Sequence, residues 1–160
     1  MTNKKLATNK KILLATNYSD SSDQALEFAT YLAKCLNAKM TIAHVADIEP
    51  YPVGELFDEE PIPDSEEFQR LRRVKPVDRT VKYEHRLLFG QPGSAKTTDV
   101  VQALMDFAKK QRVELIVVGG RRRTALGSAI AGSVADALVR RAECPVLTVP
   151  FVAKRQYAVV

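Results

Sequence analysis

Short apolar runs recur along the chain, and longer segments with helical periodicity separate most of them. Runs of this length, bounded by polar and turn-forming residues, are typical of buried strands. Strands that alternate with helices predict an α/β layer fold with a parallel sheet. The five runs are 11–16 (KILLAT), 40–46 (MTIAHVA), 81–89 (VKYEHRLLF), 113–118 (VELIVV) and 146–149 (VLTV).

Helices are expected between these strands. The first follows the polar segment 17–22 (NYSDSS), whose residues favour helix N-caps, and continues to Leu36. Another ends at Gln111, and the last begins at Gly132–Ser133. The apolar positions that predict these helices are Leu26, Ala29, Leu32, Ala33 and Leu36, then Val101, Leu104, Phe107 and Ala108, and finally Val134, Ala137 and Leu138.

One segment departs from this alternation. Residues 47–78 are rich in proline and contain the acidic patch Asp58-Glu59-Glu60. We expect a long surface excursion there with one short helix at 65–73, for which Ser65 followed by two glutamates provides a start.

Composition and charge narrow the function classes. A net charge of +5 fits nucleic acid, an anionic ligand or simple solubility. The basic residues are spread out, and their one dense cluster, 121–123, has no aromatic residue nearby to stack on bases, which argues against nucleic-acid binding. No apolar run is long enough for a membrane span and the N-terminus lacks a signal peptide, so we expect a cytoplasmic protein.

The residues that most often bind metals are few and isolated. Cys35 and Cys144 match no metal or redox spacing, and we expect both to be reduced thiols in the core. His44 and His85 each lie in a predicted strand, so no metal site is predicted.

The stretch GQPGSAKTT at 90–98 resembles the phosphate-binding loop G-x-x-x-x-G-K-[ST], and it follows a strand and precedes a helix. Ala95 replaces the second glycine, whose missing Cβ lets the backbone wrap a phosphate. The best apolar strand also ends in Gly119-Gly120, where a hydrolase needs a carboxylate for Mg²⁺. We interpret the stretch as a turn at Gly90 and a helix cap at Ser94.

A second glycine-containing segment is the better candidate. Ligands of open parallel sheets bind at the carboxyl ends of the strands, which makes the loops after Thr16, Ala46 and Val118 the candidate loops. Gly119 lies just past a strand, and Gly132-Ser133 begins a helix whose free N–H groups favour an anion. The alternative is a glycine turn followed by an ordinary helix cap, and the spacing alone leaves both open.

These segments, taken together, resemble a known family. The segment after 113–118 is similar to the late motif G-x2-G-x9-G-[ST] of the universal stress protein family, with Gly119, Gly132 and Ser133 in the matching positions. KILLATNYSDSSDQALEFATYLA, TIAHVAD, EHRLLFGQPG and CPVLTV resemble other parts of that family in the right order, over residues 10–150. The resemblance implies a universal stress protein domain at 10–150, between a flexible N-terminus (1–9) and a C-terminal tail (151–160).

The resemblance also implies an open five-stranded parallel sheet of Rossmann-like type, often paired into a homodimer through the last strand. Some members of the family bind ATP, with Mg²⁺ only alongside it, and others do not. The matching base and ribose positions are Ala15, Thr16, Asn17 and Val45. The matching phosphate positions are Gly119, Gly132, Ser133 and Val134.

Two residues depart from the family pattern. Arg122 replaces the second glycine, so its guanidinium can clamp phosphate, or its bulk can close the loop against a nucleotide. Asn17 replaces the usual aspartate, which keeps hydrogen bonding but loses the charge.

Three functions follow from these observations. The first is a stress-response protein that acts through an ATP-type cleft and partner binding, without catalytic residues, because no nucleophile–base pair or carboxylate dyad is visible. The second is a dimeric interaction module that binds no nucleotide, which Arg122 and Asn17 favour. The third is a weak ATP hydrolase, whose nearest metal ligands, Asp20 and Asp23, fit better as helix-start residues.

Overall fold

All strand pairings in the structure are parallel, and the strands lie in the order β3-β2-β1-β4-β5. The structure, a computed structural model, describes residues 10–46, 66–90, 97–120 and 133–152. The strands are β1 (Lys11–Ala15), β2 (Lys39–Ala46), β3 (Tyr83–Phe89), β4 (Leu115–Gly120) and β5 (Val146–Pro150). The helices are α1 (Asp20–Leu36), α2 (Glu66–Arg73), α3 (Thr97–Gln111) and α4 (Val134–Arg141). This confirms the predicted open five-stranded parallel sheet flanked by helices.

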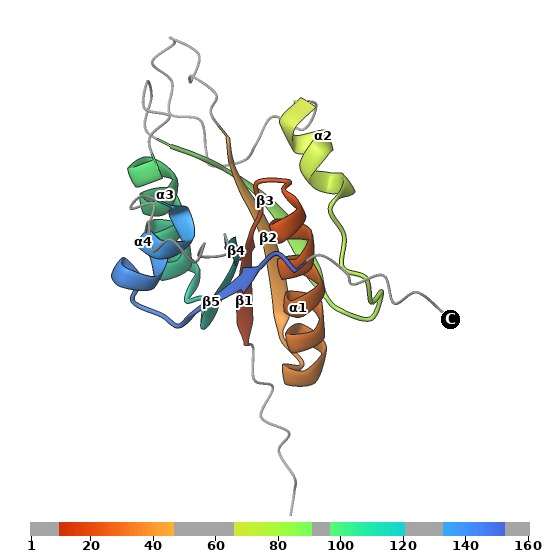
Figure 1. The fold of residues 1–160 in the computed structure, drawn as a ribbon. Coiled ribbons are helices and arrows are strands. Elements are labelled where there is room, and N and C mark those ends of the chain that lie inside the picture. The colour runs from red at the N-terminus through yellow and green to blue at the C-terminus, as the bar shows by residue number, and fades with distance from the viewer. Residues whose placement is uncertain (1–9, 47–65, 91–96, 121–132, 153–160) are drawn as a thin grey trace, which may run out of the picture.

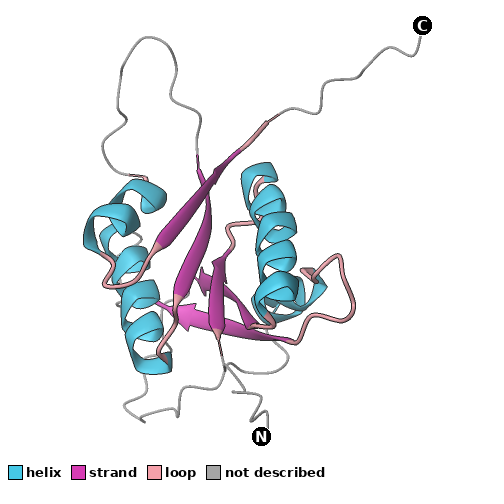
Figure 2. Ribbon diagram, turned by 90° about the horizontal axis from the view of Figure 1, so that it is seen from below, coloured by secondary structure: helices cyan, strands magenta, loops and turns pink. Residues whose placement is uncertain are grey.

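The helices cover both faces of the sheet (Figures 1 and 2). Helices α1 and α2 pack on one face, where one apolar cluster is centred on Leu14, Met40 and Ile42. Helices α3 and α4 pack on the other, around a second cluster that contains Leu13 and Ile116. Because successive residues of a strand point to opposite faces, the run Ile12–Ala15 feeds both clusters and is buried throughout.

The order of the strands fixes the place of the candidate site. From β1 the chain adds β2 and β3 on one side, and later places β4 and β5 on the other. The carboxyl ends of β1 and β4 therefore form the topological switch point, where neighbouring connections leave in opposite directions.

Each strand has at least one end that differs from the prediction by one or two residues, and the starts of β4 and β3 each differ by two. Val113 precedes β4, because its N–H bonds the carbonyl of Ala108 while Arg112 ends α3 with a left-handed backbone at φ 55°. The third strand begins at Tyr83 and not at Val81.

The prediction that both cysteines lie in the core was wrong for Cys35. Its side chain is exposed on α1, while Cys144 is half-buried. Leu36 is also 38% exposed, because α1 ends there at the left-handed cap residue Asn37. The helix runs past the apolar cluster at this end.

Candidate functional site

Thr16 and Asn17 leave β1 at the switch point. Thr16 is buried, and its N–H donates to the carbonyl of Ala43 on β2, so it continues the ladder one residue beyond the strand. Its Oγ1 accepts a hydrogen bond from the N–H of Tyr18 at 3.1 Å. The end of β1 is therefore held on both its backbone and its side chain.

The side chain of Asn17 is joined to the start of α1. Its Oδ1 accepts hydrogen bonds from the hydroxyls of Ser19 (2.5 Å) and Ser22 (2.6 Å), and from the N–H of Ser19 (3.2 Å). Within the described part of the chain, no residue accepts a hydrogen bond from Nδ2. The carboxamide thus uses its acceptor to order the helix cap and presents its donor N–H groups outward.

Gly119 is required by the packing of β4 against α1. A Cβ built on it would lie 2.6 Å from the carbonyl carbon of Ser21 and 2.8 Å from the carbonyl oxygen. These are backbone atoms, so a rotamer change cannot relieve the contact. The sequence suggested that backbone approaches a ligand at Gly119; the structure shows that backbone of the same chain approaches it there.

The start of α4 supplies the part of the predicted phosphate site that the structure describes. Ser133 is the N-cap, and its Oγ accepts a hydrogen bond from the N–H of Asp136 at 3.1 Å. Its carbonyl accepts from Ala137 N–H, as at an ordinary helix start. The predicted site residues Arg122 and Gly132 lie outside the described residues, as do the acidic patch at 58–60 and the cap at Ser94.

Three predicted residues share one apolar cluster on the α3 and α4 face. Ala15 is buried within it, and Val45 and Val134 pack half-buried against it. Val118, the last core residue of β4 before Gly119, belongs to the same cluster. The carboxyl ends of β1, β2 and β4 and the first residue of α4 therefore all contribute to the apolar cluster on this face.

Comparison with known proteins identifies the family of this chain. The model of the universal stress protein family matches residues 8–150. The chain belongs to the universal stress protein family. A universal stress protein of Methanocaldococcus jannaschii is 32% identical over 149 residues, covering 88% of this chain and 81% of that protein. One of Thermus aquaticus is 32% identical over 144 residues, covering 88% and 98%.

Solved structures of the universal stress protein family have the same fold. One, solved in complex with cAMP, is 26% identical with a TM-score of 0.59, covering 88% of this chain and 95% of that one. A family member from Burkholderia pseudomallei is also 26% identical with a TM-score of 0.59, covering 91% and 98%.

In this family member, a polar cluster that the sequence analysis missed lies beside the candidate site. His44 Nδ1 bonds the carbonyl of Thr16 at 2.7 Å, and its ring lies 4.5 Å from the ring of Tyr18. From α2, Arg70 lies 4.1 Å over the Tyr18 ring and Glu67 Oε2 lies 3.6 Å from His44 Nε2. Strand alternation could have placed His44 on the face covered by α1 and α2, the face of Met40 and Ile42. Its partners on α2, however, follow a long segment without periodicity.

Tyr18 is unusual in this cluster. Burial, with a further contribution from the Glu67 carboxylate, raises the pKa of Tyr18 to about 12, and Arg70 acts in the opposite direction. Its hydroxyl is buried and has no hydrogen-bond partner among the described residues. The Arg70 guanidinium lies over its ring, and the His44 imidazole is tilted by 39° against it.

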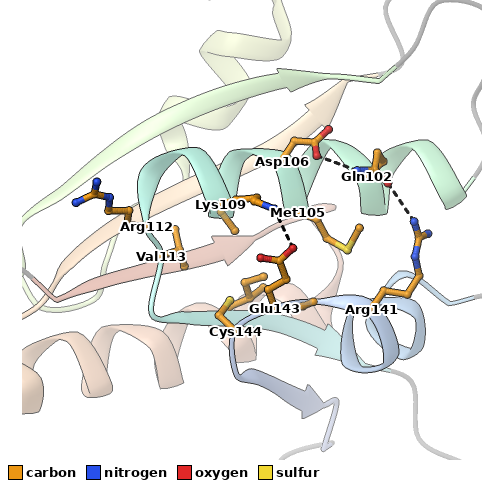
Figure 3. A pocket seen from close by; sticks show the side chains of 12 residues that line it. Gln102, Met105, Asp106, Lys109, Arg112, Val113, Arg141, Glu143 and Cys144 are labelled. Carbon is orange, nitrogen blue, oxygen red and sulfur yellow. Dashed lines mark hydrogen bonds and ion pairs between the residues drawn. The ribbon is translucent and has the colours of Figure 1, made fainter.

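A cavity of about 370 Å³ lies elsewhere, between the C-terminal half of α3 and the segment that joins α4 to β5 (Figure 3). Its apolar lining includes Val113, which precedes β4, so the cavity is at the opposite end of that strand from Gly119. Polar side chains on its rim pair with each other: Lys109 with Glu143 at 3.1 Å, and Arg141 with Gln102 at 3.0 Å.

The described residues provide neither a metal-type cluster nor a membrane-type helix. They contain no group of three or more His, Cys, Asp or Glu side chains that could hold a metal ion. No helix in the described ranges is both long and apolar enough to cross a bilayer.

Proposed function

We propose that the chain binds an adenine nucleotide at the carboxyl ends of β1, β2 and β4, and that it acts in stress response through ligand-linked partner binding. The observation that carries this proposal is that Ala15, Val45 and Val134, from three elements that end or begin near the switch point, belong to one apolar cluster. The likeness to a universal stress protein solved with cAMP supports the same ligand class.

Most of the predicted residues have a role in this proposal. Ala15 and Val45 provide an apolar wall for the base, and Asn17 offers its Nδ2 donors to the base or ribose. N–H groups in the first turn of α4, after Ser133, donate hydrogen bonds to the phosphate oxygens. Arg122 and Gly132 complete the phosphate loop, where the guanidinium of Arg122 clamps the ligand or its bulk closes the loop.

Two further proposals concern assembly and location. β5 is a short edge strand, and its Val146, Leu147 and Thr148 are half-buried, which supports pairing with a second copy into a homodimer. We place the dimer in the cytoplasm. Light scattering of the purified protein would give the oligomeric state, and a monomer at high concentration would contradict the dimer.

The nucleotide proposal is tested by what the protein carries and what it binds. Mass spectrometry after denaturation would identify co-purified nucleotide, and titration calorimetry with cAMP, AMP and ATP, with and without Mg²⁺, would measure affinity. Absence of binding at millimolar nucleotide would overturn the proposal and leave the alternative of a nucleotide-free interaction module.

Two variants make the location of the site testable. Gly132→Leu is expected to abolish binding, because a bulky residue blocks the turn beside the phosphate. Lys96→Ala is the matched control and is expected to leave affinity nearly unchanged. If Lys96→Ala abolished binding, the stretch 90–98 would be a phosphate loop after all.

A further inference from the structure

His44 lies between two hydrogen-bond acceptors. Its Nδ1 is 2.7 Å from the carbonyl oxygen of Thr16, and its Nε2 is 3.6 Å from Oε2 of Glu67. Neither acceptor can donate: a carbonyl never does, and an ionised carboxylate has no proton. The side chain of His44 is only 17% exposed, so water replaces these partners less readily than at the surface.

A neutral imidazole can satisfy only one of these two acceptors. If Nδ1 carries the proton, it donates to Thr16 and the lone pair of Nε2 faces the carboxylate. If Nε2 carries it, the lone pair of Nδ1 faces the carbonyl at hydrogen-bond distance. Only the imidazolium, which has both N–H groups, can donate to Thr16 and at the same time direct an N–H towards Glu67, 3.6 Å away.

The surroundings of Glu67 also call for an N–H donor on Nε2 of His44. Its Oε2 is buried and makes no hydrogen bond with any described residue, and a buried carboxylate oxygen without a donor is costly. The other titratable or charged groups around the imidazole are Tyr18 and, on α2, Arg70, which lies over the Tyr18 ring. His85, on the same face of β3, bonds the carbonyl of Val74 with its Nε2.

The contact between Glu67 and His44 is linked to the candidate site through Thr16. The carbonyl that His44 holds belongs to the peptide bond leading to Asn17, whose side chain orders the start of α1. Val45, the neighbour of His44 on β2, packs on the apolar cluster of the opposite face. His44 therefore connects α2 to the end of β1, beside the residues assigned to the base.

We propose that His44 is a positioning residue of the nucleotide site, and that its protonation joins α2 to the end of β1 and so makes ligand binding depend on pH. The part that concerns ligand binding rests on the proposed function; the part that concerns α2 does not. At low pH the imidazolium holds both Thr16 and Glu67. At high pH the neutral ring releases one of them, which loosens α2 or the Thr16–Asn17 peptide.

Hydrogen exchange of the α2 amides tests the first part without any ligand. Exchange of residues 66–73 is measured at pH 5.5 and pH 8 and corrected for the intrinsic rate. In Glu67→Gln, protection of α2 is expected to fall at pH 5.5 and to equal or exceed that of the wild type at pH 8, because the glutamine amide can donate to a neutral Nε2. Arg70→Gln is the control, and it should lower protection equally at both pH values.

Titration with cAMP tests the second part, since its single phosphodiester charge is constant between these pH values. Wild-type affinity is expected to be several-fold higher at pH 5.5 than at pH 8. His44→Asn places an amide donor where Nδ1 lies, so it keeps the bond to Thr16 but cannot reach Glu67. Its affinity should remain measurable and lose the pH dependence.

The outcomes separate the two proposals. Equal loss of α2 protection at both pH values in Glu67→Gln overturns the role of His44 protonation. If that variant fails to fold, His44→Asn gives the same test, with protection lowered at pH 5.5 only. Wild-type cAMP binding that does not change with pH overturns the link to the ligand site. Absence of cAMP binding at either pH contradicts the proposed function, while the exchange result still decides the α2 contact.

Discussion

Replacing Gly119 by alanine is expected to destabilise the protein whether or not a ligand is present. The new Cβ would lie 2.6 Å from the backbone carbonyl carbon of Ser21 and 2.7 Å from its Oγ, below any normal separation. The hydroxyl can rotate away, but the carbonyl group cannot move without α1 or β4. Overpacking of this kind costs about 1 to 3 kcal/mol, and a clash with backbone falls in the upper half, at about 2 to 3 kcal/mol.

The measurement is urea or thermal unfolding of the nucleotide-free protein, followed by circular dichroism because the chain has no tryptophan. For a protein of this size, the loss corresponds to a decrease in Tm of about 4 to 12 °C. Stripping any bound nucleotide first is essential, since a ligand that binds only the native state also raises Tm.

Gly120 provides a matched control. A Cβ there would lie 2.3 Å from Cγ2 of Thr148, and the next nearest atom outside the adjoining residues is Cβ of the same threonine, at 3.8 Å. Gly120→Ala should therefore recover most of its lost stability when combined with Thr148→Ser, which removes that methyl group. No change in the side chain of Ser21 should rescue Gly119→Ala. Unchanged stability of Gly119→Ala together with lost nucleotide binding would refute the packing role and restore the ligand role of this glycine.

Three further predictions follow from the geometry. The pKa of Tyr18 is raised to about 12, so the highest step of the alkaline absorbance titration should vanish in Tyr18→Phe, and a step that persists would contradict the assignment. The contribution of Tyr18 to stability should be present below pH 10 and lost as the pH rises towards 12. Asn17→Asp should leave stability unchanged or slightly higher, because one carboxylate oxygen can replace Oδ1 beside the start of α1. Calorimetry should show weaker nucleotide binding, because the carboxylate has no N–H to donate to the base or ribose. Tighter binding would contradict the donor role of Nδ2 and would indicate that an acceptor is needed at this position. Hydrogen bonds from Lys34, the larger contribution, and from Thr80 hold the pKa of Asp78 well below its usual range. The stability difference between wild type and Asp78→Asn should therefore be present above about pH 4, decline as the pH falls below it, and shrink in high salt. A difference that grows in acid would exclude this cause.

The fold could be predicted from the sequence because its signals are local. The mainly apolar run 113–118 predicts a buried strand, which the structure has at Leu115–Gly120. The spacing of Leu26, Ala29 and Ala33 predicts the buried face of α1, and all three are buried. The same periodicity could have placed Cys35 correctly, since it lies four residues from the exposed Tyr31. That prediction failed because the usual burial of cysteine was given more weight than its position on the helix.

The site was less predictable because its contacts join distant parts of the chain. Nothing near Gly119 in the sequence indicates that Ser21 lies against it, and nothing near His44 indicates Glu67. The late glycines pointed to the right end of the sheet, since the switch point follows from strand order. The role of Gly119, however, depends on how closely β4 and α1 approach, which only the folded chain determines.

The strand order also has a consequence for how the protein is made. β1 lies in the middle of the sheet, and Leu13 pairs with Thr41 on one side and with Ile116, about a hundred residues later, on the other. During synthesis from the N-terminus, β1, β2 and β3 can therefore assemble while the second edge of β1 is still unpaired. That edge is apolar, and an exposed edge of this kind invites pairing with other chains. A nascent chain that stalls before residue 115 would thus be prone to aggregate, and nucleotide could stabilise only the chain that has been completed through α4.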